Sequence, residues 1–146
     1  MASSTTDNWI AESAIFIKAP IAKVWDALTN PEIIKQWFFG VDTITDWKVG
    51  SPILHRGVWD GKPFEDKGTV LKFEPRKMVM TTHWSPLSGT PDIPENYQNV
   101  TYTVTERDGG TEVIIANDGN ENAESRDHSA QQWQMVLESL KKLLEK

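Results

Sequence analysis

Histidine is the side chain best suited to acid–base chemistry near neutral pH, and the sequence has three, His55, His83 and His128. They are far apart and form no HxH or HxxxH pair, which argues against a histidine metal site. Strand alternation predicts that His55 points inward, where it could hydrogen-bond a ligand or act as an acid or base. The alternative is a histidine whose bonds are satisfied within the core, or one that is exposed at a strand end. We expect His83 to face solvent or a sheet edge, and His128 to be exposed.

Other chemical signals in the sequence exclude more sites than they indicate. There is no cysteine, which rules out disulfides, thiolate metal sites and thiol catalysis. No phosphate-binding loop, dinucleotide fingerprint or serine-hydrolase motif occurs. The acidic pair Glu65 and Asp66, and the acidic residues within 121–127, are expected to be solvated surface. No catalytic residue, metal site or cofactor is therefore predicted, and an enzymatic function is left open but not favoured.

Length and charge indicate a single globular domain that binds neither nucleic acid nor membranes. Its 146 residues are typical of one domain, so we predict a single domain over 1–146, with the polar residues 1–8 flexible. The net charge of −6 argues against nucleic-acid and anionic-membrane binding, and no apolar run approaches the roughly 20 residues of a membrane span. The absence of cysteine and of a signal-like start favours the cytoplasm. We expect a monomer.

Hydrophobic periodicity and turn signals predict one strand, two short helices, about six strands and a long helix. The predicted strands cover residues 9–17, 42–48, 53–59, 64–73, 78–84, 97–106 and 111–117, the short helices begin at Pro20 and Pro31, and an irregular loop covers 85–96. The hairpin signals at 60–61 and 108–110 indicate an antiparallel sheet. The fold class is therefore α+β.

The last helix carries an apolar stripe at spacings of three and four. The stripe consists of Trp133, Val136, Leu137, Leu140, Leu143 and Leu144. Such a stripe must be buried, and the concave side of the sheet is the large apolar surface that can receive it. We therefore expect a curved sheet of six or seven strands around this helix.

Several segments resemble a known superfamily in their order and spacing. Residues 19–32, APIAKVWDALTNPE, resemble the opening of the START-like superfamily, which is also described as polyketide cyclase-like or birch-pollen-allergen-like. The matching segments of the branch homologous to the activator of the heat-shock-protein-90 ATPase are residues 34–37, 47–51, 68–70, 100–102, 110–111 and 132–141. Gln132 stands where that branch usually has glycine. The resemblance implies a helix-grip fold with a cavity between helix and sheet, which in many relatives takes lipids, sterols or polyketides.

Strand alternation and helix periodicity, together with this resemblance, select the residues expected to line the cavity. The predicted ligand-binding residues are Trp37, Phe38, His55, Trp59, Met80, Trp84, Tyr102, Trp133 and Val136. The alternative interpretation is that these large side chains simply fill the space between helix and sheet.

Three functions are compatible with the sequence. The first is noncatalytic binding of a small apolar or aromatic molecule, such as a lipid, sterol or polyketide-like compound. The second is a cyclase- or hydrolase-type enzyme on the same scaffold, which would need an acid or base aimed into the cavity. The third is a co-chaperone that regulates a heat-shock ATPase. The family name suggests that role. We do not favour it, because the predicted single domain has no second region with which to hold the chaperone.

Overall fold

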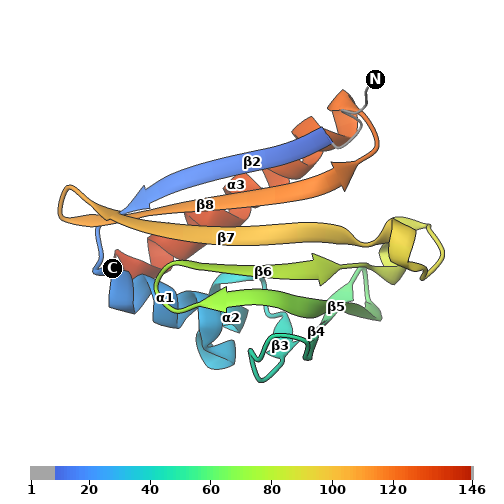
Figure 1. The fold of residues 1–146 in the computed structure, drawn as a ribbon, viewed down its shortest axis with the longest axis horizontal. Coiled ribbons are helices and arrows are strands. Elements are labelled where there is room, and N and C mark those ends of the chain that lie inside the picture. The colour runs from blue at the N-terminus through green and yellow to red at the C-terminus, as the bar shows by residue number, and fades with distance from the viewer. Residues whose placement is uncertain (1–8, 146) are drawn as a thin grey trace.

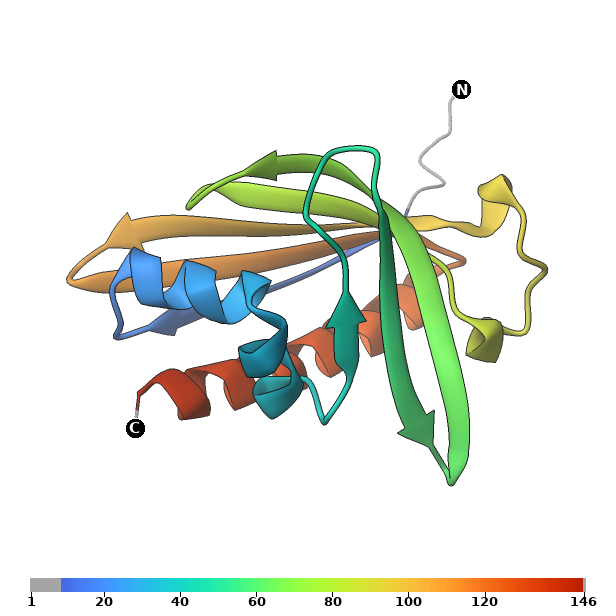
Figure 2. The same cartoon turned by 90° about the horizontal axis from the view of Figure 1, so that it is seen from below.

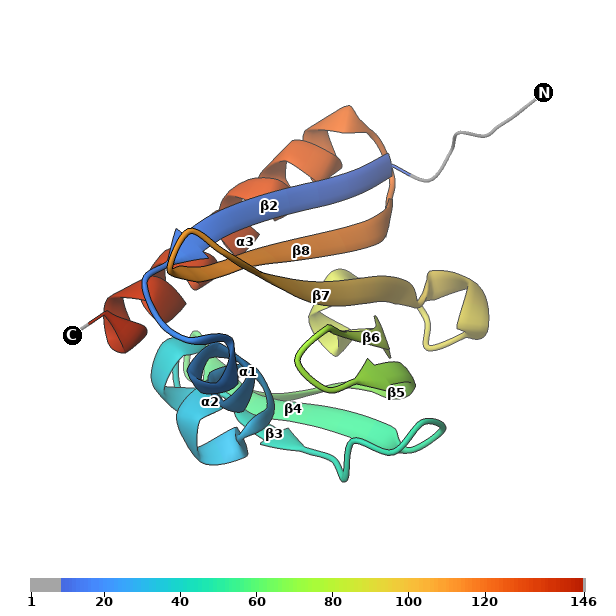
Figure 3. The same ribbon diagram turned by 60° about the vertical axis from the view of Figure 1, so that its left-hand side comes forward.

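The computed structural model describes residues 9–145 and contains one seven-stranded antiparallel sheet (Figure 1). Its strands are β2 (Trp9–Ile17), β3 (Asp42–Ile44), β4 (Pro52–Trp59), β5 (Lys62–Glu74), β6 (Met78–His83), β7 (Gln98–Arg107) and β8 (Gly110–Asn120). Their order across the sheet is β2-β8-β7-β6-β5-β4-β3. The first strand, β2, pairs with the last, β8, and the other strands pair with their neighbours in sequence. Figure 3 shows the sheet curling from β2 round to β3, which gives it a concave side.

Local sequence signals determine where the two short helices begin and end. Helix α1 (Ile21–Thr29) follows Pro20, and α2 (Pro31–Trp37) has Pro31 in its first turn. Asn30 separates them, and its side-chain oxygen caps α2 by accepting a hydrogen bond from the Glu32 N–H at 3.0 Å. The two helices lie at one end of the molecule, beside the concave side of the sheet (Figure 2).

The long helix α3 (Ala123–Leu144) lies along the concave side, as its apolar stripe predicts (Figure 2). Val136, Leu137, Leu140 and Leu144 are buried on it. Two hydrogen bonds tie the helix to β2: Ser13 Oγ donates to the Ala130 carbonyl at 2.7 Å, and Lys141 Nζ donates to the Phe16 carbonyl at 2.8 Å. The predicted α+β fold, a curved antiparallel sheet gripping its last helix, is confirmed.

The element boundaries differ most from expectation at β3. Extended structure was predicted over 42–48, but the strand ends at Ile44. The side chains of Thr45 and Asp46 accept hydrogen bonds from the backbone N–H groups of Trp47 and Lys48, at 3.2 and 2.9 Å. Trp47 itself has a positive φ of 64°. Side chain to backbone bonds of this kind compete with a sheet ladder, so the chain turns early.

The segment between β6 and β7 is irregular, as predicted, and projects beyond the end of the sheet (Figure 2). It holds two single-turn 3-10 helices, η1 (Pro86–Ser88) and η2 (Pro94–Asn96). An ion pair between Lys67 and Asp92 fastens it to β5. Within the described residues, no helix is both long enough and apolar enough to cross a membrane.

Candidate functional site

A row of polar side chains crosses the concave face of the sheet from β3 to β8. This polar row consists of Thr43, His55, Asp66, His83, Gln98 and Asn117. Thr43 pairs directly with His55, His55 with Asp66, and His83 with Gln98, and directly paired side chains lie on one face of a sheet. Most interior positions of this sheet are apolar, so a polar band here is a feature that packing alone does not require.

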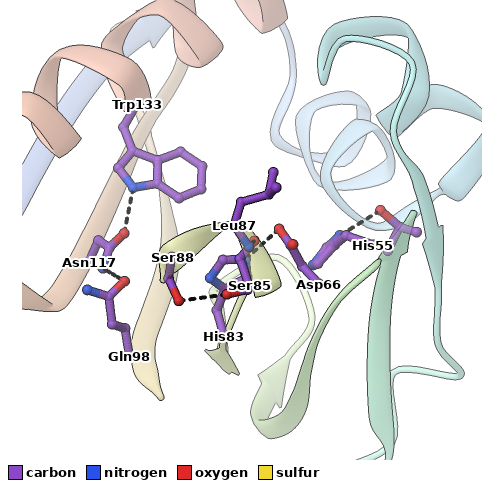
Figure 4. A network of polar contacts seen from close by, with 10 residues as sticks. His55, Asp66, His83, Ser85, Leu87, Ser88, Gln98, Asn117 and Trp133 are labelled. Carbon is purple, nitrogen blue, oxygen red and sulfur yellow. Dashed lines mark hydrogen bonds and ion pairs between the residues drawn. The ribbon is translucent and has the colours of Figure 1, made fainter. Parts of the chain in front are cut away.

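Hydrogen bonds connect neighbouring members of the row (Figure 4). Thr43 Oγ1 lies 3.2 Å from His55 Nδ1, and His83 Nε2 lies 3.0 Å from the Asp66 carboxylate. At the other end, Asn117 Nδ2 donates to Gln98 Oε1 at 3.2 Å. These bonds hold side chains from six strands in fixed positions.

Trp133 carries the network from the sheet to α3. Its indole Nε1–H donates to Asn117 Oδ1 at 3.0 Å, so the ring reaches across from the helix to the polar row (Figure 4). Phe38 stacks on Trp133, with ring centroids 6.3 Å apart, and Tyr102 meets it edge-on at 6.0 Å. The helix therefore contributes both a polar bond and the centre of an aromatic cluster.

A hollow of about 320 Å³ lies between the polar row and α3. Part of its lining is aromatic and consists of Phe38, Phe64, Tyr102 and Trp133. Polar side chains form much of the rest, and these are Asp66, His83, Gln98, Asn117, Ser129 and Gln132. Small-molecule sites have volumes of roughly 300–1,000 Å³ and combine an apolar lining with a few placed polar groups. This hollow has that composition at the lower end of the size range.

A second, smaller hollow of about 40 Å³ lies on the other side of Phe38, His55 and Tyr102. Its remaining walls include Leu28, Trp37 and Val79 and are mainly apolar. Thr81 and Val100 also line both spaces, so the two hollows adjoin each other.

Burial shifts the pKa of two titratable groups in these walls towards their uncharged forms. It lowers the pKa of His55 to about 4, with the nearby His83 ring adding to the effect and Asp66 opposing it. The pKa of Tyr102 is raised, also by burial. A neutral imidazole and a neutral phenol offer hydrogen bonds to a ligand without charge.

Asp66 has acceptor capacity that the described residues do not use. Its Oδ2 faces His83 Nε2, whereas Oδ1 is buried and has no hydrogen-bond partner among the residues that the structure describes. A carboxylate has about four lone-pair positions. The His83–Asp66 pair also resembles the histidine–carboxylate pairs used in acid–base chemistry. In the described part of the chain, no group of three or more His, Asp and Glu side chains is arranged to hold a metal ion.

Most of the residues selected from the sequence come together around these hollows. Trp37, Phe38, His55, Tyr102, Trp133 and Val136 all lie in their walls. Trp84 lies elsewhere: it stacks on Tyr97 and its Nε1–H donates to Thr90 Oγ1 at 3.2 Å, next to the η1–η2 segment. The Trp59 side chain is outside the described part of the structure.

The predicted orientation of β6 was wrong. Met80 was expected to face the cavity, but it pairs with Thr101, while the alternate residues Val79 and Thr81 line the hollows. Because strand side chains alternate, the same shift turns His83 inward, although solvent or a sheet edge was expected.

The prediction for Asp66 was also wrong, because this residue was expected to lie on the solvated surface. It lines the larger hollow, and 15% of its side chain is exposed. A signal for it did exist in the sequence. A two-residue loop at 60–61 pairs Trp59 with Lys62, which sets His55 opposite Asp66. An inward His55 therefore implies an inward Asp66.

Comparison with known proteins agrees with this fold. The family model described as activator of Hsp90 ATPase homolog 1-like protein matches residues 18–145. No match was found among the curated proteins. The solution structure of ChR145 from Cytophaga hutchinsonii is 50% identical and superimposes with a TM-score of 0.82, covering 93% of each chain.

Two further solved structures show how widely the fold recurs. The Aha1 dimer from Colwellia psychrerythraea is 25% identical, with a TM-score of 0.72 over 93% of this chain and 96% of that one. DynU16, a putative protein in the dynemicin biosynthetic locus, is 19% identical with a TM-score of 0.79, and the match covers 94% of this chain but 48% of that one. The family match over residues 18–145 confirms the resemblance seen in the sequence, and the chain belongs to the family of activator of Hsp90 ATPase homolog 1-like proteins.

Proposed function

We propose that the protein binds a small aromatic or apolar molecule in the larger hollow, without changing it chemically. The observation that carries this proposal is the hollow of about 320 Å³ between α3 and the sheet, whose lining combines aromatic and polar side chains. An aromatic ligand would stack within the cluster of Phe38, Tyr102 and Trp133. The size of the hollow favours a compact ligand over a long-chain lipid or a sterol.

The indole signal of Trp133 provides a direct test. We expect its Nε1–H resonance to shift saturably when ¹⁵N-labelled protein is titrated with compact aromatic polyketides and flavonoids, because the ring lines the hollow. The Trp84 indole, which lies outside the hollow, should stay unchanged and serves as the internal control. If no compound in a broad aromatic library moves the Trp133 signal saturably, the proposal is wrong.

A matched pair of variants separates binding in the hollow from binding at the surface. Val136 is buried and lines the hollow, whereas the neighbouring Met135 is 65% exposed. We expect Val136→Trp to fill the space and abolish binding, and Met135→Trp to leave it intact. Circular dichroism establishes that both variants fold. Unaltered binding by a folded Val136→Trp protein would place the ligand elsewhere.

Acid–base catalysis is a second candidate, and the His83–Asp66 pair in the wall of the hollow favours it. A cyclase- or hydrolase-type reaction would require a bound compound to be converted. Mass spectrometry of ligands after incubation with the wild type and with His83→Gln tests this. Product that forms only with the wild type would replace the binding proposal with an enzymatic one.

Regulation of a heat-shock ATPase has family membership as its support. A pull-down and an ATPase assay with the cognate chaperone test it, and stimulation of ATP hydrolysis is the expected result if this third function applies. The expected monomer can be checked by light scattering in the same preparations, since one relative is described as a dimer.

A further inference from the structure

The polar side chains around the larger hollow include one carboxylate and several uncharged amides. Asp66 is a carboxylate, while Gln98, Asn117 and Gln132 are amides and His83 is an imidazole. No Lys or Arg among the described residues lines this space. The hollow therefore has one carboxylate, and its described lining has no Lys or Arg to balance an acidic ligand.

The bonds that the Asp66 carboxylate makes leave most of its acceptor positions unused. Of its two oxygens, Oδ2 faces His83 Nε2 at 3.0 Å and Oδ1 has no hydrogen-bond partner among the described residues. Oδ1 is itself shielded, but 15% of the side chain is exposed, and the carboxyl group can rotate about its Cβ–Cγ bond. A buried acceptor without a donor is unfavourable, so a donor brought to this carboxylate is stabilised.

The two amides of the polar row, Gln98 and Asn117, are already committed to protein partners. Asn117 Nδ2 donates to Gln98 Oε1 and to the Asp118 carbonyl, and Asn117 Oδ1 accepts from Trp133. His55 forms its described bond to Thr43. Among the buried side-chain polar atoms of the described residues, Asp66 Oδ1 is the one left without a hydrogen-bond partner.

We infer that the ligand is an aromatic molecule bearing an uncharged hydroxyl or N–H group, which donates a hydrogen bond to Asp66, and that the site discriminates against carboxylates and other anions. This inference rests on the proposed function and specifies its ligand class. The aromatic part lies against Phe38, Tyr102 and Trp133, and the donor faces the Asp66 carboxylate in the lining of the same hollow. An anion of the same shape would meet the Asp66 carboxylate with no Lys or Arg in the described lining to offset the repulsion.

Three probes with the same ring system test the inference on the wild-type protein. They are 2-naphthol, which carries a donor, 2-methylnaphthalene, which replaces it by a methyl group of similar size, and 2-naphthoate, which carries a negative charge. Hydrogen bonds to charged groups are strong enough for a preference of roughly tenfold or more for 2-naphthol over 2-methylnaphthalene. We expect 2-naphthoate to bind more weakly than both, as measured by the Trp133 indole shift.

The outcomes distinguish this inference from the proposed function. Saturable binding of 2-naphthol and 2-methylnaphthalene with equal affinity, or tighter binding of 2-naphthoate, overturns the inference and leaves the binding function standing. Absence of saturable binding by any of the three probes and by the wider aromatic library overturns the proposed function itself.

A matched pair of variants assigns the preference to Asp66. We expect the ratio of the two affinities to fall to about one in Asp66→Leu and to be unchanged in Glu65→Leu, because Glu65 is exposed and paired with Arg56. The ¹³C signal of the Asp66 carboxyl group in the wild type gives a second measurement that needs no variant. A preference for 2-naphthol that leaves this signal unmoved would assign the donor to another group.

Discussion

The interior of this protein has two ends of opposite character along α3. Towards the C-terminus of the helix, Leu137, Leu140 and Leu144 are buried in an apolar cluster with residues of α1 and β8. Towards its N-terminus, Ser129, Gln132 and Trp133 face the polar row across the larger hollow. One helix thus contributes to a close-packed core at one end and to a partly open, polar space at the other.

The two ends of α3 therefore differ in role: one end stabilises the fold, and the other provides the space and polar groups for ligand binding. Burial of the leucines is favourable in itself, whereas burial of Asp66, His55 and Asn117 is tolerated only as far as hydrogen bonds compensate for lost hydration. The packed end therefore holds the helix in the sheet, and the open end can keep an unpaired acceptor and an unfilled volume.

The largest effect is expected from truncating a side chain at the packed end. Leu140 is fully buried, so Leu140→Ala should lower the free energy of unfolding by about 2–5 kcal/mol, through lost burial and the cavity left behind. Chemical denaturation measures this. Met135→Ala, on the exposed side of the same helix, is the control and should change stability by less than about 0.5 kcal/mol. Equal losses in the two variants would contradict the division along α3.

A pH dependence of stability should arise at the open end. The pKa of His55 is about 4 in the folded protein and 6.5 in the unfolded chain, so the unfolded chain binds a proton first as the pH falls. Stability that His55 supports is therefore complete above pH 6.5 and is lost progressively down to about pH 4. The loss is on the order of 3 kcal/mol for a shift of this size.

The variant His55→Gln isolates this contribution from the carboxyl groups that titrate in the same range. Between pH 6.5 and 4, its free energy of unfolding should depend less steeply on pH than that of the wild type. His128→Gln removes an exposed histidine and should keep the wild-type slope. If both variants retain the wild-type slope, the ring of His55 is not held neutral by burial.

The packed end could be predicted from the sequence because its signals are local. The spacing of Leu137, Leu140 and Leu144 defines the buried side of a helix, and Asn30-Pro31 separates two short helices. Val100 and Val104 lie on one face of β7 and threonines on the other, which identifies the inward face. Each of these patterns depends on residues close together in the chain.

The polar end could be predicted only in part, because its geometry depends on how distant strands pair. In β6, Met78 and Met80 on one face are as apolar as Val79 on the other, so alternation does not identify the inward side. The irregular segment 85–96 between β6 and β7 gives no register either. His83 therefore could not be placed, whereas Asp66 could have been, through the two-residue hairpin loop that sets it opposite His55.

The smallest of these effects is expected where α3 meets the polar row. Trp133→Phe keeps an aromatic ring between Phe38 and Tyr102 but removes the Nε1–H that Asn117 Oδ1 accepts at 3.0 Å. Loss of a partner for a buried acceptor costs about 1–3 kcal/mol. The adjoining hollow can admit water to Asn117, so we expect a loss of about 1 kcal/mol in chemical denaturation, together with shifted side-chain amide signals of Asn117 and Gln98. Trp84→Phe makes the same substitution where the indole bond to Thr90 is exposed, and it should cost less and leave those amide signals in place. A Trp133→Phe protein as stable as the Trp84→Phe protein, with unmoved amide signals, would show that the polar row ends at the sheet and that α3 contributes only its aromatic ring to the binding site.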